Sequence, residues 1–247
     1  MRWWTACWLS AASGWPTADS QRPGPSLLSL TAFASRDMIV VQPLPRIMKP
    51  NLVYRTAKAL ARLFYTLYGR WEIAGAQRIP ADGPVIVCPN HISYLDPPLV
   101  GAAIPRECRF MARHDLWKGS FMRWLMPRIG AYAVRRGQPD RAALRQTLEY
   151  LKQGYCVVIF PEGTRSRDGR LQPAEPGIAL IVQRSGAPVV PAAVIGADRM
   201  LPPGSRRLHR TRLKVVFGDP LFFTPDAPRQ EVTAGIMRAI GDLLAHG

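Results

Sequence analysis

The segment "KPNLVYRTAKALARLFYTLYGR", residues 49–70, carries apolar residues three or four positions apart, the spacing of one face of a helix. This apolar stripe consists of Val53, Ala57, Leu60, Phe64, Leu67 and Tyr68. Basic residues form a second stripe on another side, at Arg55, Lys58 and Arg62. We therefore predict an amphipathic helix within residues 48–70.

Two interpretations of this helix stay open, and they do not exclude each other. The helix can pack on a protein core and leave a solvated basic face. It can also lie in a membrane interface, with the apolar stripe in the acyl boundary and the basic stripe at anionic headgroups. We predict the membrane-facing arrangement because the whole chain is strongly basic.

After this helix, short apolar runs alternate with segments of helical periodicity. The runs predict strands within residues 84–89, 108–113, 155–160, 187–196 and 212–218. Helices are predicted from Asp96, between Asp140 and Gly154, over residues 177–186, and from Gln230 onward. Strands that alternate with helices indicate an α/β fold with a mixed, mainly parallel sheet flanked by helices.

Residues 1–47 are rich in Pro and Ser and show little periodicity, so we predict a disordered or weakly structured N-terminal extension. The first 20 residues resemble a signal peptide only faintly, and Met38 or Met48 is an alternative start. Residues 48–247 then form a single domain. No run of 18 or more uncharged apolar residues is present, so we predict no transmembrane helix.

The composition is that of an ordinary globular protein except for its charge. Apolar residues make up 47% of the chain, and the formal net charge is +16. Such an excess implies an anionic partner: nucleic acid, an acidic membrane surface, a phosphorylated substrate or an acidic carrier protein. The four cysteines are scattered without a CxxC pair, which indicates a reducing compartment and no zinc site.

The stretch "NHISYLDPP", residues 90–98, places His91 directly after an apolar run and Asp96 five residues later. Five residues of a regular helix turn about 500°, which would point the two side chains about 140° apart. A functional pair therefore requires a bend, and the turn through Ser93 into a helix that opens at Asp96 supplies one. Asp96 can then fix the tautomer of His91, which would act as a general base. The alternatives are a structural histidine and an aspartate that only caps the helix.

The segment "FPEGTRS", residues 160–166, follows a predicted strand, and α/β sheets bind ligands at the carboxyl ends of their strands. Gly163 can let backbone amides approach an anion closely, and Arg165 offers a planar fork that matches phosphate. Glu162 can accept hydrogen bonds from a hydroxyl or order Arg165. The alternative is a polar turn with a solvated charge pair.

A third segment, "GAYAVRRG", residues 130–137, ends an apolar strand-like run with two adjacent arginines. Arg135 and Arg136 can bind phosphate, or they can form a charged pair on a surface loop. No serine lies in a G-x-S-x-G elbow, so the sequence does not favour a covalent serine hydrolase.

These segments, together with "VVPAAVIG", occur in the order seen in the glycerolipid acyltransferase family. The chain resembles a bacterial 1-acylglycerol-3-phosphate acyltransferase across roughly residues 80 to 200. The resemblance implies that residues 48–247 form a single acyltransferase domain. It also implies that His91 and Asp96 are catalytic and that no metal or other cofactor is bound.

The resemblance assigns the acceptor phosphate to Arg136 and carries the family's P-E-G-T block onto Glu162, Gly163 and Thr164, with Arg165 beside them. Two positions depart from the family pattern. Arg135 stands where the family often has an acidic residue. Ala174 and Glu175 stand where it often has an aromatic–lysine pair, which puts the identity of the acceptor in question more than the reaction type.

The expected reaction moves a fatty acyl group from acyl-CoA or acyl carrier protein to the hydroxyl of a lysophospholipid. 1-Acyl-sn-glycerol-3-phosphate is the first expected acceptor and phosphatidate the product; glycerol-3-phosphate or a lyso-aminolipid is the alternative. The expected place is the cytoplasmic face of the cell membrane, on an anionic surface. A non-catalytic basic protein that binds nucleic acid or membranes is the competing hypothesis, but no nucleic-acid-binding motif is recognisable.

Overall fold

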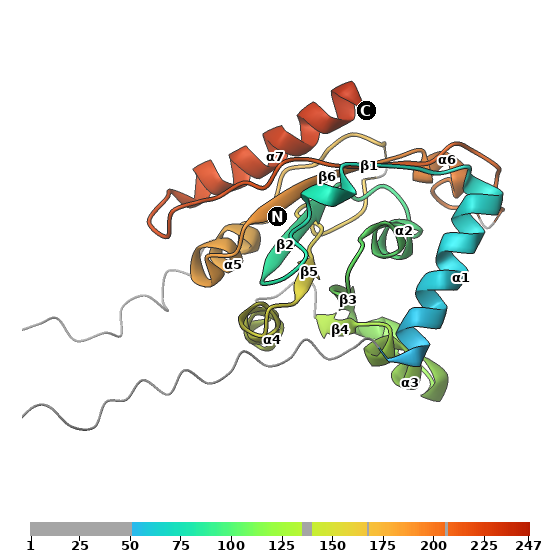
Figure 1. Ribbon diagram of the computed structural model, residues 1–247, viewed down its shortest axis with the longest axis horizontal. Coiled ribbons are helices and arrows are strands. Elements are labelled where there is room, and N and C mark those ends of the chain that lie inside the picture. The colour runs from blue at the N-terminus through green and yellow to red at the C-terminus, as the bar shows by residue number, and fades with distance from the viewer. Residues whose placement is uncertain (1–50, 135–139, 167, 206) are drawn as a thin grey trace, which may run out of the picture.

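The computed structural model of the protein describes residues 51–134, 140–166, 168–205 and 207–247. The predicted N-terminal extension over residues 1–47 lies outside the described residues. The described part is an α/β fold built on one sheet (Figure 1). Its strands are β1 Glu72–Ala74, β2 Val85–Pro89, β3 Cys108–Arg113, β4 Ala131–Val134, β5 Cys156–Val158, β6 Val189–Ile195 and β7 Lys214–Phe217.

The sheet has the strand order β1-β7-β6-β2-β5-β3-β4. Neighbouring strands are parallel except β6 and β7, which are antiparallel. This arrangement confirms the prediction of a mixed, mainly parallel sheet. The helices are α1 Leu52–Gly69, α2 Asp96–Ala103, α3 Ser120–Arg128, α4 Arg141–Lys152, α5 Gly177–Ser185, α6 Ala197–Met200 and α7 Arg229–His246. Two 3₁₀ turns, η2 Ala76–Arg78 and η3 His114–Trp117, complete the described elements.

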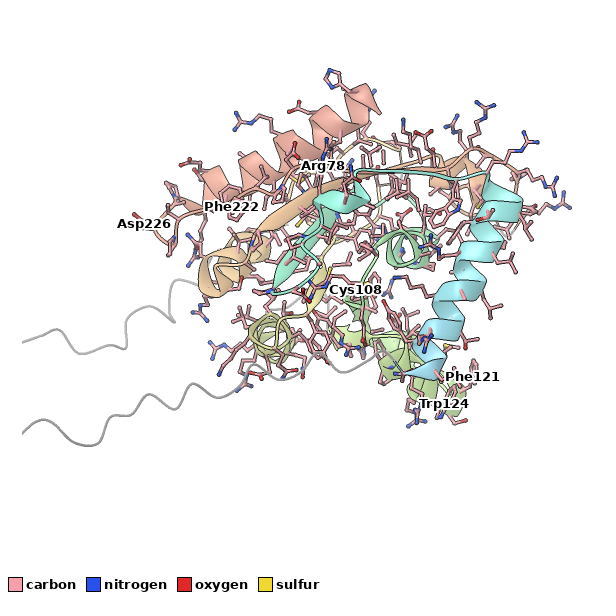
Figure 2. The ribbon with its side chains drawn as sticks, in the orientation of Figure 1. Arg78, Cys108, Phe121, Trp124, Phe222 and Asp226 are labelled. Carbon is pink, nitrogen blue, oxygen red and sulfur yellow. The ribbon has the colours of Figure 1, made fainter. Side chains whose placement is uncertain are left out.

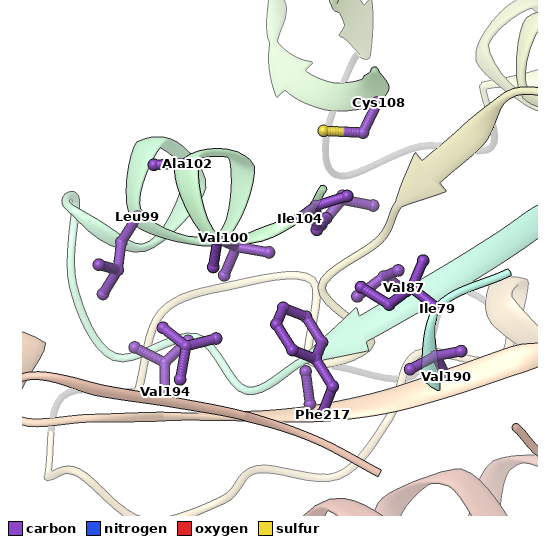
Figure 3. Close-up of a cluster of buried hydrophobic side chains, with 14 of the residues drawn as sticks. Ile79, Val87, Leu99, Val100, Ala102, Ile104, Cys108, Val190, Val194 and Phe217 are labelled. Atoms are coloured by element: carbon purple, nitrogen blue, oxygen red, sulfur yellow. The ribbon is translucent and has the colours of Figure 1, made fainter. Parts of the chain in front are cut away.

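Helices cover both faces of the sheet, because its central strands are apolar on both sides. In β2, Val85 and Val87 enter one core cluster, with α1 and α2, whereas Ile86 and Cys88 enter the other, with α4, α5 and α7. Figure 1 shows these two groups of helices on opposite sides of the sheet. Figure 3 shows side chains of α2 facing those of β6 and β7 in the first cluster.

Local sequence signals explain the predicted ends of α4 and α5. Asp140 caps α4, since its side chain accepts from the backbone N–H groups of Ala142 and Ala143 at 3.1 and 3.0 Å. Gly186 ends α5 in the left-handed conformation, with φ 61°. Helix α3, of which no residue is buried, was not predicted, because Pro127 lies inside this short segment.

Helix α1 is the amphipathic helix predicted within residues 48–70, but its basic stripe faces the protein more than expected. The ammonium group of Lys58 donates to the carbonyl oxygens of Ile104 and Arg106, and Arg62 donates to the carbonyl oxygen of Ala102 at 3.1 Å. These carbonyls lie at and after the C-terminal end of α2. Lys58 and Arg62 therefore attach α1 to α2, and only Arg55 of the three lacks a side-chain hydrogen bond to a described residue.

We predict that Lys58→Ala lowers the free energy of unfolding by about 1–3 kcal/mol, because two partly buried carbonyl groups lose a charged donor. Arg55→Ala, an exposed site on the same helix, should change it by less than about 0.5 kcal/mol. Urea unfolding followed by circular dichroism measures both variants. Equal stabilities of the two variants would show that Lys58 is not an attachment point.

Candidate active site

The two polar motifs meet at one edge of the sheet because their strands are parallel neighbours. Strand β2 leads into "NHISYLD" and β5 leads into the "FPEGTRS" loop, and the two strands pair through Ile86 and Val157. The carboxyl ends of parallel strands lie at the same edge, where α/β sheets bind ligands. The folded chain thus brings together two segments about 70 residues apart, each of which the sequence placed after a strand.

His91 and Asp96 form a buried hydrogen-bonded pair. The distance between His91 Nδ1 and Asp96 Oδ2 is 2.7 Å, and the two side chains are 8% and 0% exposed. The backbone N–H groups of Ile92 and Ser93 donate to the same Oδ2 atom, each at 2.7 Å. The turn required by the five-residue spacing is therefore closed by the aspartate itself. Asp96 is the first residue of α2 rather than its N-cap, which is Leu95.

The pair leaves one imidazole nitrogen available. Since the Asp96 carboxylate accepts at Nδ1, we assign the proton of neutral His91 to Nδ1 and the free lone pair to Nε2. No described residue forms a hydrogen bond with Nε2. The ring also packs against the ring of Phe160, at a centroid distance of 4.2 Å. This arrangement can take up a proton at Nε2 and stabilise the resulting imidazolium through Asp96.

Glu162 is buried, with 3% of its surface exposed, and both of its carboxylate oxygens accept from backbone amides. Oε1 accepts from the His91 N–H at 2.7 Å, and Oε2 accepts from the Gln172 N–H at 2.9 Å. Burial raises the pKa of Glu162, while the two amide donors oppose that rise by stabilising the carboxylate. No described ion pair joins Glu162 to Arg165, so the ordering of Arg165 by Glu162 that the sequence left open is not present.

The turn around Gly163 differs from an anion-binding loop. Gly163 has a φ of +67°, and a Cβ atom there would lie 2.7 Å from Cγ of Glu175. The Gly163 N–H donates to the Phe160 carbonyl oxygen at 3.0 Å, and the Thr164 N–H donates to the Glu162 carbonyl oxygen at 2.7 Å. These amides already have partners inside the loop. A ligand would therefore meet the exposed Thr164 and the Arg165 side chain instead.

Arg165 is held by an aromatic ring from the other motif. Its guanidinium carbon lies 3.3 Å from the centroid of the Tyr94 ring. A guanidinium stacked on a ring face keeps its N–H donors at the edge, where they can reach an anion. Arg165 thus remains suited to a phosphate or carboxylate group.

Arg136 lies outside the described residues, as does Arg135. The described end of β4, at Val134, lies at the same edge of the sheet as the end of β2, because β4, β3, β5 and β2 are parallel to one another. Two strands, β5 and β3, lie between β2 and β4 in the sheet.

Several residues of the site were missed by sequence reasoning. Asn90 pairs with β6: its Oδ1 accepts from the Val194 N–H at 2.7 Å and its Nδ2 donates to the Val194 carbonyl oxygen at 3.1 Å. The Ser166 N–H donates to the His91 carbonyl oxygen at 2.7 Å. The sequence indicated that Phe160 was only the last apolar residue of a strand. The structure shows that its ring contacts the His91 ring in the site.

Comparisons with known proteins show which family and which fold the chain resembles. The acyltransferase family model matches residues 70–195, slightly more than half of the chain. The 1-acyl-sn-glycerol-3-phosphate acyltransferase of Bacillus subtilis is 26% identical over 191 residues, which cover 76% of this chain and 93% of that protein. The lyso-ornithine lipid O-acyltransferase of Pseudomonas aeruginosa is 33% identical over 168 residues, 62% of this chain and 63% of that protein.

The chain spans only 49% and 47% of the length of the two chloroplast relatives that it matches. The crystal structure of the 1-acyl-sn-glycerophosphate acyltransferase PlsC from Thermotoga maritima superposes with a TM-score of 0.68. It shares 22% sequence identity, and the match covers 78% of this chain and 79% of that one. This likeness establishes the shared fold. Together with the match of the family model over the residues that carry the His91–Asp96 pair, it shows that the chain belongs to the acyltransferase family.

Proposed function

We propose that this acyltransferase moves a fatty acyl group from a thioester to the hydroxyl of a lysophospholipid. The observation that carries the proposal is the buried His91–Asp96 pair, whose Nε2 atom is free at the carboxyl edge of the sheet. The acceptor we propose first is 1-acyl-sn-glycerol-3-phosphate, with phosphatidate as the product. The acyl donor is acyl-CoA or acyl carrier protein, and both are anionic, which suits a chain of net charge +16.

In the proposed reaction, Nε2 of His91 takes the proton of the acceptor hydroxyl as its oxygen attacks the thioester carbonyl carbon. Asp96 holds Nδ1–H and stabilises the imidazolium that forms. The tetrahedral oxyanion collapses by breaking the carbon–sulfur bond. The thiolate then leaves and takes the proton from His91, which restores the neutral base. No covalent acyl-enzyme is required.

Arg165 and Arg136 hold the acceptor phosphate in this proposal. The guanidinium of Arg165 is oriented by Tyr94. Arg136 comes two positions after Val134 in the sequence, and Val134 ends β4 at the same edge of the sheet. Thr164 is exposed beside Arg165 and can donate its hydroxyl to the same group. Gly163 shapes the turn, since a side chain there would collide with Glu175.

One observation favours a lyso-aminolipid as a second candidate acceptor. Glu175 packs directly over Gly163 and forms no ion pair with a described residue, so its exposed carboxylate is a negative charge beside the proposed headgroup site. A headgroup that carries an amine next to an acidic group would match Arg165 and Glu175 together, whereas a phosphomonoester would match Arg165 alone.

We also propose that the protein works from the surface of an anionic membrane, at its cytoplasmic face. No described helix is both long and apolar enough to cross a bilayer. Helix α1 exposes a row of leucines, with exposed fractions of 76% for Leu52, 61% for Leu60, 55% for Leu63 and 66% for Leu67. Phe121 and Trp124 of α3 continue this apolar surface at the N-terminal end of α1 (Figure 2).

Positive charge adjoins the other end of the same helix. The hydroxyl of Tyr68 in α1 donates to the Leu208 carbonyl oxygen at 3.0 Å, which fixes the loop after α6 beside α1. Exposed arginines around this loop form no ion pair with a described residue; they are Arg70, Arg199, Arg207, Arg210 and Arg212. Leucines beside unpaired arginines match the acyl boundary and the headgroups of an anionic bilayer.

A transfer assay with purified protein tests the proposed function. Acyl-CoA and acyl carrier protein donors are each offered with lysophosphatidate, glycerol-3-phosphate and a lyso-aminolipid that carries both an amine and an acid. Faster transfer to lysophosphatidate supports the first acceptor, and faster transfer to the lyso-aminolipid supports the second. Absence of transfer with every pair, together with salt-dependent binding to nucleic acid, would support the non-catalytic alternative.

We predict that His91→Ala lowers kcat by at least about 10²–10⁴-fold, because a positioned general base contributes that much. Asp96→Asn should lower kcat by about 100-fold or more, since an amide cannot stabilise the imidazolium and can offer its own N–H to Nδ1. Steady-state assays on folded variants measure both. Unchanged turnover for His91→Ala would remove His91 from the mechanism. An Asp96→Asn effect confined to the melting temperature would leave Asp96 only the structural role of closing the turn before α2.

For Arg136, we predict that substitution by Ala raises KM for the phosphorylated acceptor by about tenfold or more, because a charged hydrogen bond is lost, while KM for the acyl donor changes little. Lys should restore this only in part, since it lacks the bidentate fork of arginine. Initial rates at varied acceptor and donor concentrations separate the two constants. Equal effects on both substrates would contradict a headgroup role.

The membrane proposal predicts that the triple variant Leu60→Gln, Leu63→Gln, Leu67→Gln partitions about 100-fold less onto anionic vesicles, at about 1 kcal/mol for each leucine. Phe222→Gln is the matched control, because Phe222 is 78% exposed and lies away from α1, at the far end of the molecule (Figure 2). Vesicle sedimentation measures partitioning, and activity on a short-chain soluble acceptor should persist. Equal partitioning of the triple variant and the control would place the docking surface elsewhere.

A further inference from the structure

Both polar groups of the His91 peptide are held by the "FPEGTRS" loop. The His91 N–H donates to Glu162 Oε1 at 2.7 Å, and the His91 carbonyl oxygen accepts from the Ser166 N–H at 2.7 Å. The Phe160 ring of the same loop lies against the imidazole, with the two planes tilted by 30°. One loop thus contacts the N–H group, the carbonyl group and the imidazole ring of the proposed base.

Glu162 connects this contact to the far end of the loop. Its second oxygen accepts from the Gln172 N–H at 2.9 Å, so one carboxylate joins the turn after β2 to the segment that follows the loop. The carboxylate is removed from solvent, with the residue 3% exposed. An acceptor hydroxyl or headgroup meets almost none of its surface, and the two short amide hydrogen bonds already stabilise the buried carboxylate.

We infer that Glu162 is a positioning residue for His91 and not a ligand of the acceptor. The inference rests on the proposed function, in which His91 is the base. By fixing the backbone of His91 while Asp96 fixes its ring, Glu162 keeps Nε2 at one place at the carboxyl edge of the sheet. General-base catalysis depends on such placement, since a shift of about 1 Å can cost about 100-fold in rate.

The loop then has two sides with separate tasks. Its inner side, with Phe160, Glu162 and the Ser166 amide, faces His91. Its outer side carries Thr164 and Arg165, with Arg165 stacked on the exposed Tyr94 ring. Substitutions on the inner side should therefore change kcat, and substitutions on the outer side should change KM for the acceptor.

Glu162→Gln tests the inference with the smallest change of shape. A glutamine offers one acceptor oxygen where two amide donors point, so its NH₂ group must face either the His91 or the Gln172 N–H. We expect kcat to fall about 10- to 100-fold, with KM for the acceptor unchanged within about twofold. Arg165→Ala, from the other side of the same loop, is the matched variant: its KM for the acceptor should rise at least about tenfold.

A second readout does not depend on turnover. In the wild-type protein the amide protons of His91 and Gln172 are both bonded to Glu162. In Glu162→Gln the exchange of at least one of them with solvent should speed up by about tenfold or more, as measured by NMR. The exchange of amides in the middle of α7 reports global stability and should stay unchanged. Glu162→Ala removes both acceptor oxygens and should speed up the exchange of the His91 amide as well. If this variant fails to fold, Glu162→Gln carries the test.

Three results would overturn the inference. The first is a rise in acceptor KM with kcat unchanged, which would make Glu162 a ligand. The second is wild-type kcat in the folded variant, and the third is unchanged exchange of both the His91 and the Gln172 amides. If the wild-type protein transfers acyl groups to no acceptor, the proposed function fails instead, and the exchange experiment still decides whether Glu162 holds His91.

Discussion

The site depends on one oxygen atom, Oδ2 of Asp96. This atom is fully buried and accepts from the imidazole of His91 and from the backbone amides of Ile92 and Ser93, each at 2.7 Å. An unpaired buried carboxylate would be strongly destabilising, and these three donors compensate for its desolvation. The same bonds close the turn between β2 and α2. The hydrogen bonds that fold this turn therefore also position the imidazole of His91.

The parallel sheet brings a second loop, distant in the sequence, beside this turn. Strands β2 and β5 are hydrogen-bonded neighbours, so the loop after β5 passes beside the turn after β2. Glu162 and Ser166 then satisfy the N–H and carbonyl groups of His91, which a buried turn could not leave unpaired. On its other side, Asn90 extends the hydrogen bonding of β2 to Val194 of β6. The turn that carries His91 is thus fixed from both neighbouring strands.

The exterior of the molecule is organised separately from this centre. Helix α1 uses Lys58 and Arg62 to attach itself to the end of α2, while its leucines and Arg55 remain exposed. Arg199, Arg207, Arg210 and Arg212, which form no ion pair with a described residue, follow β6. The carboxyl end of β6 lies at the same edge of the sheet as that of β2. A surface that binds anionic lipid through α1 and this loop would thus adjoin the edge that carries His91. In this arrangement the basic surface would bind the membrane that holds the lipid acceptor, next to the proposed base.

The sequence by itself determined the alternation of strands and helices, the caps at Asp140 and Gly186, and the position of His91, Asp96 and the "FPEGTRS" loop at strand ends. These features follow from local periodicity and turn chemistry. Helix α3 was not predicted from the sequence, because Pro127 lies inside this short apolar segment. Only the tertiary structure decided that Lys58 faces inward, that the amides of the Gly163 turn already have partners, and that Glu162 holds the backbone of His91. The contacts of Lys58 and Glu162 join residues 46 and 71 positions apart, and a backbone amide or carbonyl leaves no mark in the sequence to show which distant side chain will satisfy it.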